Sequence, residues 1–102
     1  MIIAGLDEKE GPSIYAVQPS GAAIKQDYAL GGSGSGFIFA YVDANFKPNM
    51  SLEEAKNLLK KSVSLAMSRD GSSGGIIRIL NVTPQSVTRE YITHTELPYR
   101  FP

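Results

Sequence analysis

The chain of 102 residues contains no cysteine and no tryptophan, and its single histidine is His94. The lack of cysteine excludes disulfide bonds and thiolate metal sites, and it fits a reducing compartment. One imidazole without further nitrogen or sulfur ligands does not make a zinc site. We therefore expect His94 to be a solvated residue near the end of the last strand.

Clustered charge of one sign is also missing, since ten basic and ten acidic residues give a formal net charge of +0. Nucleic-acid and anionic-membrane surfaces need clustered Lys and Arg, so we expect neither a nucleic-acid nor a membrane partner. No apolar run approaches the ~20 residues of a membrane span. Hydrophobic residues make up 42% of the chain and charged residues 20%. This composition is typical of one globular domain with a modest core.

Apolar and alternating segments near both ends of the chain predict strands. The polar turn at 7–12 and the turn at 83–86 each lie between two such segments, which predicts two hairpins. A third segment, 22–30, is a weaker strand because Lys25, Gln26 and Asp27 fall within it. The predicted strands are 1–6, 13–18, 22–30, 75–82 and 87–93.

The segment 51–69 is predicted to be an amphipathic helix. Ser51 and Glu54 have the spacing of a capping box, and Gly71 provides a stop. Its predicted apolar stripe consists of Leu52, Ala55, Leu59, Ser62, Val63 and Ala66. The segment 37–46 is ambiguous, because its aromatic and β-branched residues favour a strand. Helical spacing, with Ser35 as a possible N-cap, favours a helix equally.

The predicted order is strands, one or two helices, then strands, which is the α+β class. One long helix can cover only one face of about five strands. A sheet that is bare on its other face would be a large apolar patch, and soluble monomers rarely expose such a patch. We therefore expect either a partner or a larger domain around this chain.

Two turns rich in glycine and serine, 31–36 and 69–75, carry the candidate chemistry. The first could be an anion site, but its spacing is neither GxGxxG nor a Walker motif, so a structural tight turn is the simpler interpretation. In the second, the carboxylate of Asp70 lies at the negative end of a helix dipole, beside Ser72 and Ser73. It could cap a local amide, or it could have a functional role. A Ser–His–Asp arrangement would require His94 to meet Ser33 or Ser73.

The sequences around these turns resemble those of proteasome β subunits, in particular of the caspase-like type. The matching stretches are 2–7, 31–36, 41–43, 66–78 and 96–98, and the distance between the two turns agrees as well. The match covers almost the whole chain but only about the C-terminal half of such a subunit. We therefore expect residues 1–102 to be the C-terminal portion of a single β-subunit domain.

The resemblance implies the fold of the N-terminal nucleophile hydrolases, a four-layer α/β/β/α sandwich with two antiparallel sheets. It makes 37–46 a helix, and it assigns the sheet that covers the bare face to a missing N-terminal half. It also implies a threonine hydrolase, in which the threonine hydroxyl attacks the peptide carbonyl while an amine or lysine takes the proton.

The resemblance further implies supporting roles in that site for three residues. Ser33 would form a hydrogen bond near the α-amine of the threonine, Asp70 would orient the nucleophile's surroundings, and Ser73 would complete the polar cluster. In some family members, backbone carbonyls equivalent to those near Met67, Asp70 and Ser73 hold a cation, and no other cofactor is implied. Position 1 is Met, so the nucleophile and its lysine are expected upstream, and the chain start fits a fragment or truncated gene model.

The parent protein would then cleave after acidic residues during ubiquitin-dependent and other protein degradation. Its partners would be polypeptide substrates and the other β and α subunits of a stacked-ring 20S core particle, in cytoplasm and nucleus. Because the nucleophile is absent here, one alternative is a truncated, non-catalytic β-like subunit that acts as a ring scaffold or assembly factor. Another alternative is a free-standing glycine-loop binding module.

Overall fold

The computed structural model describes residues 1–93, 96 and 97, so the expectation for His94 lies outside the described residues. The chain divides into two compact units. The first consists of Met1–Gly31 and Leu80–Arg89, and the second of Gly32–Ile79 and the described residues from Glu90 onward. Each unit is described by itself.

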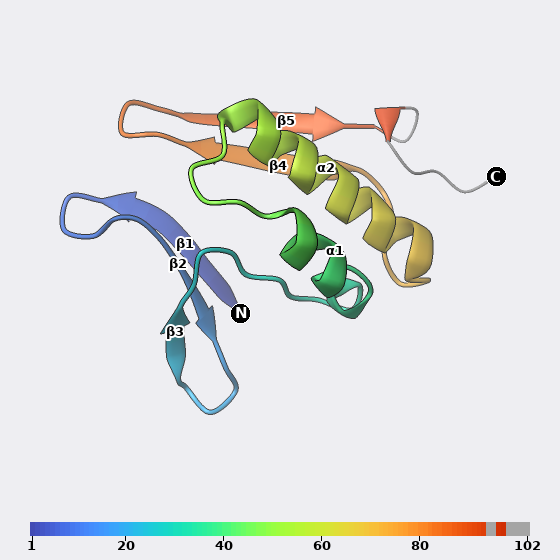
Figure 1. Cartoon of the computed structure of the whole chain (residues 1–102), viewed down its shortest axis with the longest axis horizontal. Helices are drawn as coiled ribbons and strands as arrows, with labels where there is room; N and C mark the ends of the chain where they lie inside the picture. The colour runs from blue at the N-terminus through green and yellow to red at the C-terminus, as the bar shows by residue number, and fades with distance from the viewer. Residues whose placement is uncertain (94–95, 98–102) are drawn as a thin grey trace. The chain divides into compact units, whose positions relative to one another are not determined.

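The first unit contains a three-stranded antiparallel sheet in the order β1-β2-β3 (Figure 1). Its strands are β1 (Ile2–Asp7), β2 (Gly11–Val17) and β3 (Ala23–Lys25). The first two confirm the predicted hairpin, whereas β3 covers only three residues of the predicted segment 22–30. In the hairpin turn, Asp7 Oδ1 accepts hydrogen bonds from the backbone N–H groups of Lys9 at 2.9 Å and Glu10 at 2.7 Å.

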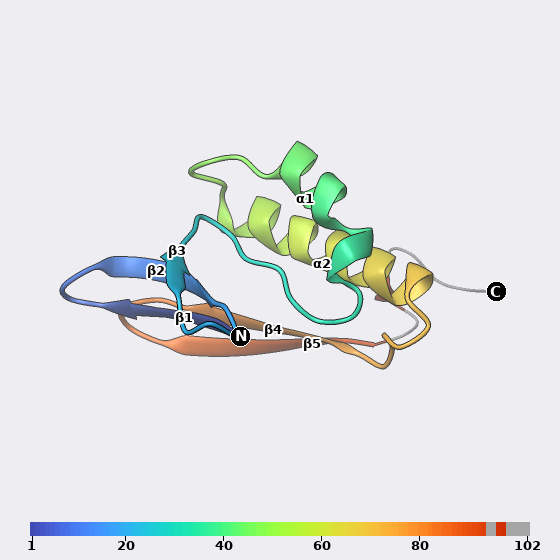
Figure 2. The ribbon, with the colours of Figure 1, turned by 90° about the horizontal axis from the view of Figure 1, so that it is seen from below.

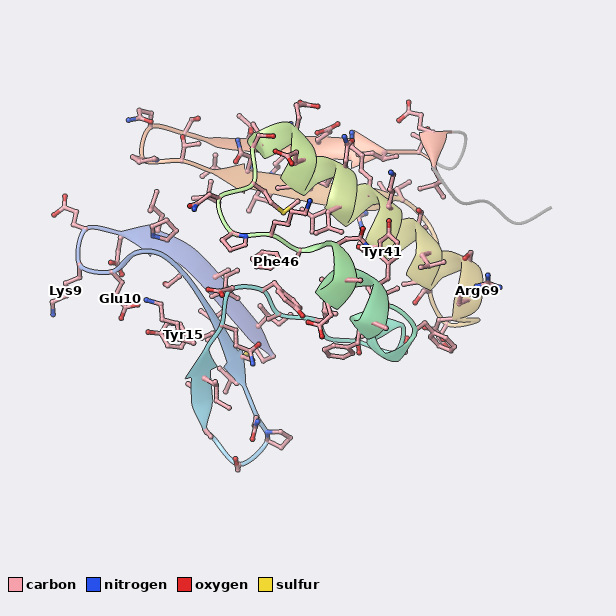
Figure 3. All side chains as sticks on the ribbon, in the orientation of Figure 1. Lys9, Glu10, Tyr15, Tyr41, Phe46 and Arg69 are labelled. Atoms are coloured by element: carbon pink, nitrogen blue, oxygen red, sulfur yellow. The ribbon has the colours of Figure 1, made fainter. Side chains whose placement is uncertain are left out.

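Side chains on the first hairpin form a small polar group (Figure 3). The hydroxyl of Tyr15 donates to the carboxylate of Glu10, with oxygen distances of 2.9 Å and 3.1 Å. Lys25 Nζ lies 4.0 Å from the same carboxylate. The hydrogen bond to Glu10 raises the pKa of Tyr15, because its hydroxyl proton is held by an anion. This group therefore links the β1–β2 turn to strands β2 and β3.

The second unit contains η1 (Ser35–Phe37), α1 (Phe39–Asn45) and α2 (Leu52–Arg69). The hairpin of β4 (Ile77–Val82) and β5 (Val87–Ile92) is shared between the two units. Figure 2 shows α2 lying along the part of the hairpin, at 77–79 and 90–92, that belongs to the second unit. The α+β class and the antiparallel hairpins are thus confirmed.

The N-terminus of α2 has the predicted capping box. Ser51 Oγ accepts from the backbone N–H of Glu54 at 3.1 Å, and Glu54 Oε1 accepts from the backbone N–H of Ser51 at 3.2 Å. These two bonds satisfy two of the N–H groups that have no partner within the helix. The helix therefore starts where its sequence places the cap.

The ambiguous segment 37–46 is helical, but the predicted N-cap at Ser35 is wrong. The helix α1 begins after Ile38, and its N-cap makes no side-chain hydrogen bond. Ser35 lies instead in η1, and its hydroxyl donates to the carbonyl of Gly32 at 2.9 Å. The short helix η1 begins at Ser35, so this serine lies four positions before Phe39, the first residue of α1, and cannot cap it.

The apolar stripe predicted for α2 is correct only in part. Three of its large residues stay exposed, with 50% of Leu52, 48% of Leu59 and 36% of Val63 accessible to solvent. The buried positions of the helix are Ser62, Ser64 and Ala66. The two serines can be buried because their hydroxyls donate to backbone carbonyls of the preceding turn, those of Leu58 at 2.6 Å and Lys61 at 3.2 Å.

The core of the second unit lies between α2 and the strands. Ile77, Ile79, Ile92 and Leu97 form one buried cluster, and Met67 of α2 packs against it. Apolar residues that alternate with this cluster along the hairpin are only partly covered by the described chain. Leu80, Val82, Val87 and Tyr91 are between 43% and 56% exposed. Apolar side chains therefore remain bare on the second hairpin, as the sequence led us to expect.

An ion pair links the same helix to β5. The carboxylate of Glu90 lies 3.2 Å from Lys56 Nζ and 3.2 Å from Lys60 Nζ. The hydrogen bond from Lys56, followed by that from Lys60, holds the pKa of Glu90 below its ordinary value. All three side chains are partly covered, which reduces the screening of their charges by solvent.

We expect Glu90→Gln to lower the stability of the chain at neutral pH and to weaken its pH dependence. Folding lowers the pKa of Glu90, so the ion pair stabilises the fold above the ordinary pKa of a glutamate. That stabilisation is lost as the pH falls through the lowered value. Urea midpoints measured at about pH 7 and about pH 3 check this. Glu8→Gln, in the β1–β2 turn, is the control; equal pH dependence of both variants would contradict the prediction.

Candidate functional site

The two glycine–serine turns meet at Asp70, the C-cap residue of α2. The backbone of Asp70 is extended, with φ −100° and ψ 119°, and its N–H still donates to the carbonyl of Ala66 at 2.8 Å. The chain then turns back, so that the N–H of Ser73 donates to the carbonyl of Asp70 at 3.1 Å. The helix end therefore fixes both the position and the direction of this carboxylate.

Three donors from the two turns surround the carboxylate of Asp70. Its Oδ2 accepts from the hydroxyl of Ser33 at 2.6 Å and from the hydroxyl of Ser73 at 2.7 Å. Its Oδ1 accepts from the backbone N–H of Ser72 at 3.3 Å. Ser33 is 37 residues from Asp70 in sequence, so only the tertiary structure brings them together. We call Ser33, Asp70 and Ser73 the Asp70 cluster.

These hydrogen bonds stabilise the ionised carboxylate. The pKa of Asp70 lies below its ordinary value because of the donor Ser33, then Ser73, with partial desolvation opposing them. The helix dipole disfavours an anion at this position, and the donors offset that cost. Asp70 is therefore an anion at neutral pH.

The Asp70 cluster is built to receive a donor or a cation. A serine hydroxyl has one proton, and both hydroxyls commit theirs to the same oxygen of Asp70. The lone pairs that remain on Ser33 and Ser73 can only accept. The serines are not activated nucleophiles, because a carboxylate with a lowered pKa is a weak base at neutral pH. Ser33 is exposed, while Asp70 and Ser73 are half-buried, so one side of the cluster is accessible.

An anion site at the first turn is not supported by this geometry. An anion at the turn 31–36 would meet the carboxylate of Asp70, which Ser33 contacts at 2.6 Å, and like charges repel. Met67 packs against the buried cluster that includes residues of β4 and β5. A triad with His94 lies outside the described residues.

Metal ligands of the usual kinds are not gathered in the part of the chain that the structure describes. No group of three or more His, Cys, Asp or Glu residues there could hold a metal ion. Both carboxylate oxygens of Asp70 already accept hydrogen bonds. The cation site that the resemblance implies, at backbone carbonyls near Met67, Asp70 and Ser73, stays a prediction; such carbonyls are among the oxygen ligands that hard cations take.

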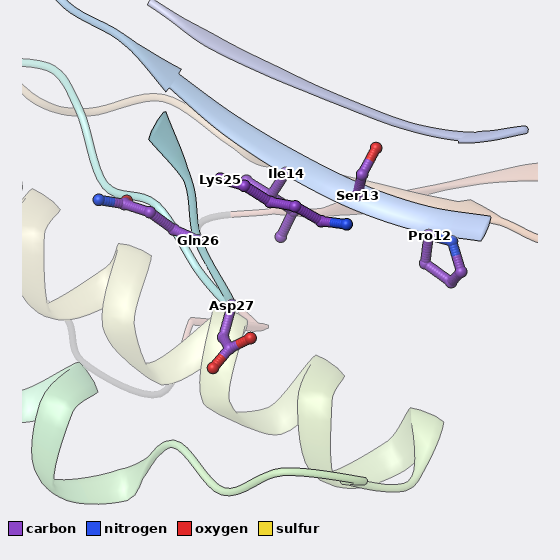
Figure 4. A pocket seen from close by; sticks show the side chains of 6 residues that line it. All are labelled: Pro12, Ser13, Ile14, Lys25, Gln26 and Asp27. Carbon is purple, nitrogen blue, oxygen red and sulfur yellow. The ribbon is translucent and has the colours of Figure 1, made fainter. Parts of the chain in front are cut away.

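A cavity of about 500 Å³ lies in the first unit (Figure 4). It shares no residue with the Asp70 cluster. Lys25 and Asp27 carry opposite charges at its wall, and the rest of the lining is small or uncharged. Its lining residues are Pro12, Ser13, Ile14, Lys25, Gln26 and Asp27. We place the candidate site at the Asp70 cluster, because two hydroxyls there donate to one oxygen of a carboxylate. Among the described helices, none is both long and apolar enough to cross a membrane.

Comparison with known proteins identifies the family. The family model described as "Proteasome subunit" matches residues 1–82. The chain belongs to the proteasome subunit family. Its resemblance to proteasome β subunits is thereby confirmed, and this family implies the N-terminal nucleophile hydrolase fold.

Individual relatives of this proteasome-family chain are β-type subunits. A probable proteasome subunit beta type-1 of Schizosaccharomyces pombe is 48% identical over 89% of the chain and 40% of the relative. Proteasome subunit beta type-6 of Dictyostelium discoideum is 43% identical over 96% of the chain and 46% of the relative. Human proteasome subunit beta type-9 is 45% identical over 96% of the chain and 44% of the relative. The chain thus spans less than half the length of these relatives.

We expect Ser33→Ala to raise the pKa of Asp70 towards its ordinary value, because Ser33 contributes the strongest of the hydrogen bonds that lower it. Because folding lowers the pKa of Asp70, its ionised carboxylate stabilises the fold at pH values above the ordinary pKa of an aspartate. That stabilisation is lost as the pH falls through the lowered value. Ser33→Ala therefore reduces the stability that ionised Asp70 contributes at neutral pH. A carbon-13 titration of the Asp70 carboxyl measures the change.

Ser35→Ala is the matched control, because its hydroxyl belongs to the same turn but donates to the carbonyl of Gly32. The two variants remove the same atom two residues apart. If both shift the pKa of Asp70 equally, the assignment of Ser33 as its principal donor is wrong.

Proposed function

We propose that this chain is the C-terminal part of a proteasome β subunit of the caspase-like type, which hydrolyses peptide bonds after acidic residues. Membership of the family and the β-type names of the relatives support the subunit class. The stretches 31–36 and 66–78, which contain the two turns, resemble those of caspase-like subunits and so support the caspase-like type. In this proposal, residues 1–102 are one portion of a single β-subunit domain.

The observation that carries the proposal is the donation of two hydroxyls to one oxygen of an ionised carboxylate. Such a cluster suits a neighbouring ammonium group, which can donate to the free lone pairs of the hydroxyls and is attracted by the anion. The α-amine of an N-terminal threonine has this chemistry. The threonine itself would come from residues outside this chain.

Each residue of the Asp70 cluster then has a role. The threonine hydroxyl attacks the carbonyl carbon of the peptide bond, and its proton passes to an amine that acts as the base. Ser33 accepts a hydrogen bond near that amine. Asp70 stabilises the ammonium that forms and orients its surroundings, while Ser73 holds the carboxylate in place. None of the three bonds to the substrate.

The same proposal gives a role to the bare apolar side chains. Leu80, Val82, Val87 and Tyr91 are exposed on the second hairpin, and a second sheet packed over them would remove them from water. We propose that this sheet comes from the remainder of the subunit and completes a four-layer α/β/β/α sandwich. Fully burying an exposed Leu or Val side chain stabilises a fold by roughly 1.5–3 kcal/mol, and side chains that are already half covered contribute correspondingly less.

The proposed partners are polypeptide substrates and the other β and α subunits of a stacked-ring core particle. The proposed location is the cytoplasm and nucleus, and no nucleic-acid or membrane partner is proposed. A cation held by backbone carbonyls of Met67, Asp70 and Ser73 stays a prediction. The proposed hydrolysis takes no step through it.

We expect Asp70→Asn, made in the full gene product and assembled in its core particle, to slow hydrolysis after acidic residues by about 10²-fold. The amide keeps the shape of the carboxylate but removes the charge that stabilises the ammonium. The effect falls on kcat rather than KM, because Asp70 does not touch the substrate. Initial rates on fluorogenic peptides with acidic, basic and apolar residues before the scissile bond measure it.

Ser35→Ala in the same particle is the control. Unchanged hydrolysis of the acidic substrate in the Asp70→Asn particle would overturn the catalytic proposal. Co-purification of the chain with the particle, without any dependence of hydrolysis on Asp70, would favour the alternative of a ring scaffold.

A further inference from the structure

Gly34, between the two serines of the first turn, lies at the tightest point of the Asp70 cluster. A Cβ built on Gly34 would lie 2.9 Å from Ser73 Oγ, 3.1 Å from the Cβ of Ala66 and 3.4 Å from Asp70 Oδ2. Unbonded carbon atoms prefer separations of ~3.5–4.0 Å. The space beside Gly34 is therefore already filled by the other residues of the site.

This closeness is specific to Gly34 among the glycines of the two turns. A Cβ on Gly36, Gly71 or Gly74 would meet nothing within 4 Å. Gly34 is buried, and its φ of −86° and ψ of −7° lie outside the left-handed region that favours glycine. The site therefore needs glycine at 34 for space, not for backbone freedom.

None of the neighbouring atoms can move away without consequence. Ala66 is buried in the interior of α2, so its Cβ moves only with the helix. Ser73 Oγ can rotate, but it then leaves Asp70 Oδ2, to which it now donates at 2.7 Å. If instead the turn lifts, Ser33 is carried away from the same oxygen, 2.6 Å from it in the native arrangement. Either response removes one hydroxyl donor from Asp70.

We propose that Gly34 is a positioning residue of this site. Its missing side chain allows the hydroxyls of Ser33 and Ser73 to donate together to one oxygen of Asp70, and a larger residue separates them. The catalytic consequence of this role rests on the proposed function. The structural consequence, a lost donor at Asp70, does not.

The structural consequence is tested on the chain itself with Gly34→Ala and the matched control Gly36→Ala. The donors Ser33, Ser73 and Ser72 cause the lowered pKa of Asp70, so its carboxyl titration reports on them directly. Gly34→Ala raises this pKa by as much as Ser33→Ala or Ser73→Ala does, and Gly36→Ala leaves it unchanged. A Gly34→Ala chain that titrates like the wild type overturns the proposal.

Two further variants keep the test decisive. In a chain that carries both Ser33→Ala and Ser73→Ala, adding Gly34→Ala shifts the pKa of Asp70 no further, because no hydroxyl is left to displace. A further shift would show that Gly34 acts by another route. If Gly34→Ala alone does not fold, adding Ala66→Gly removes the contact with the rigid helix. Only the Ser73 hydroxyl must then move, so the pKa of Asp70 in the Gly34→Ala/Ala66→Gly chain equals that in the Ser73→Ala chain.

The catalytic consequence is tested in the assembled core particle. Gly34→Ala lowers kcat on the acidic substrate by roughly ten- to a hundredfold, because a small displacement of a positioning group has effects of this size. KM changes little, and Gly36→Ala has no effect. If Asp70→Asn and Ser33→Ala also leave hydrolysis unchanged, the proposed function fails. If they slow it and Gly34→Ala does not, only the role of Gly34 fails.

Discussion

The donation of two hydroxyls to one oxygen of Asp70 is the constraint on which the second unit depends. Asp70 ends α2, Ser73 follows it, and Ser33 precedes η1 by two residues, so these bonds tie two turns to one helix end. A carboxylate at the C-terminus of a helix is electrostatically disfavoured, and the hydroxyls remove that penalty. The same bonds leave an anion with outward acceptors, which is the property that the proposed chemistry uses.

Close packing of small residues makes this arrangement possible. Ala66 is buried on α2 and Gly34 is buried beside it, so the turn can approach the helix closely. The buried serines Ser62 and Ser64 donate their hydroxyl protons to carbonyls within the helix, which allows these polar side chains to be buried. Large apolar side chains such as Leu52 and Leu59 remain outside. Their exposure, like that of the second hairpin, supports the proposal of a larger subunit around this chain.

Local signals in the sequence predicted most elements correctly. The capping box of Ser51 and Glu54, the turn at 83–86 and the polar turn after β1 each act over a few residues, so their structure follows from neighbouring positions. The N-cap at Ser35 was wrong because the separate short helix η1 begins there and α1 begins only after Ile38. Propensity left 37–46 undecided, and the resemblance to a family supplied the helix that the structure has.

The sequence by itself determined most of the secondary structure, the resemblance to a family and the identity of Ser33, Asp70 and Ser73 as candidates. Only the tertiary structure decided that these side chains share one oxygen, and that Gly34 rather than its neighbouring glycines lies against them. The physical reason is the separation in sequence between the interacting residues. Caps and turns depend on residues three or four positions apart, whereas a bond across 37 residues depends on how a turn packs against a helix. In a run of alternating glycine and serine, no local pattern distinguishes one position from the next.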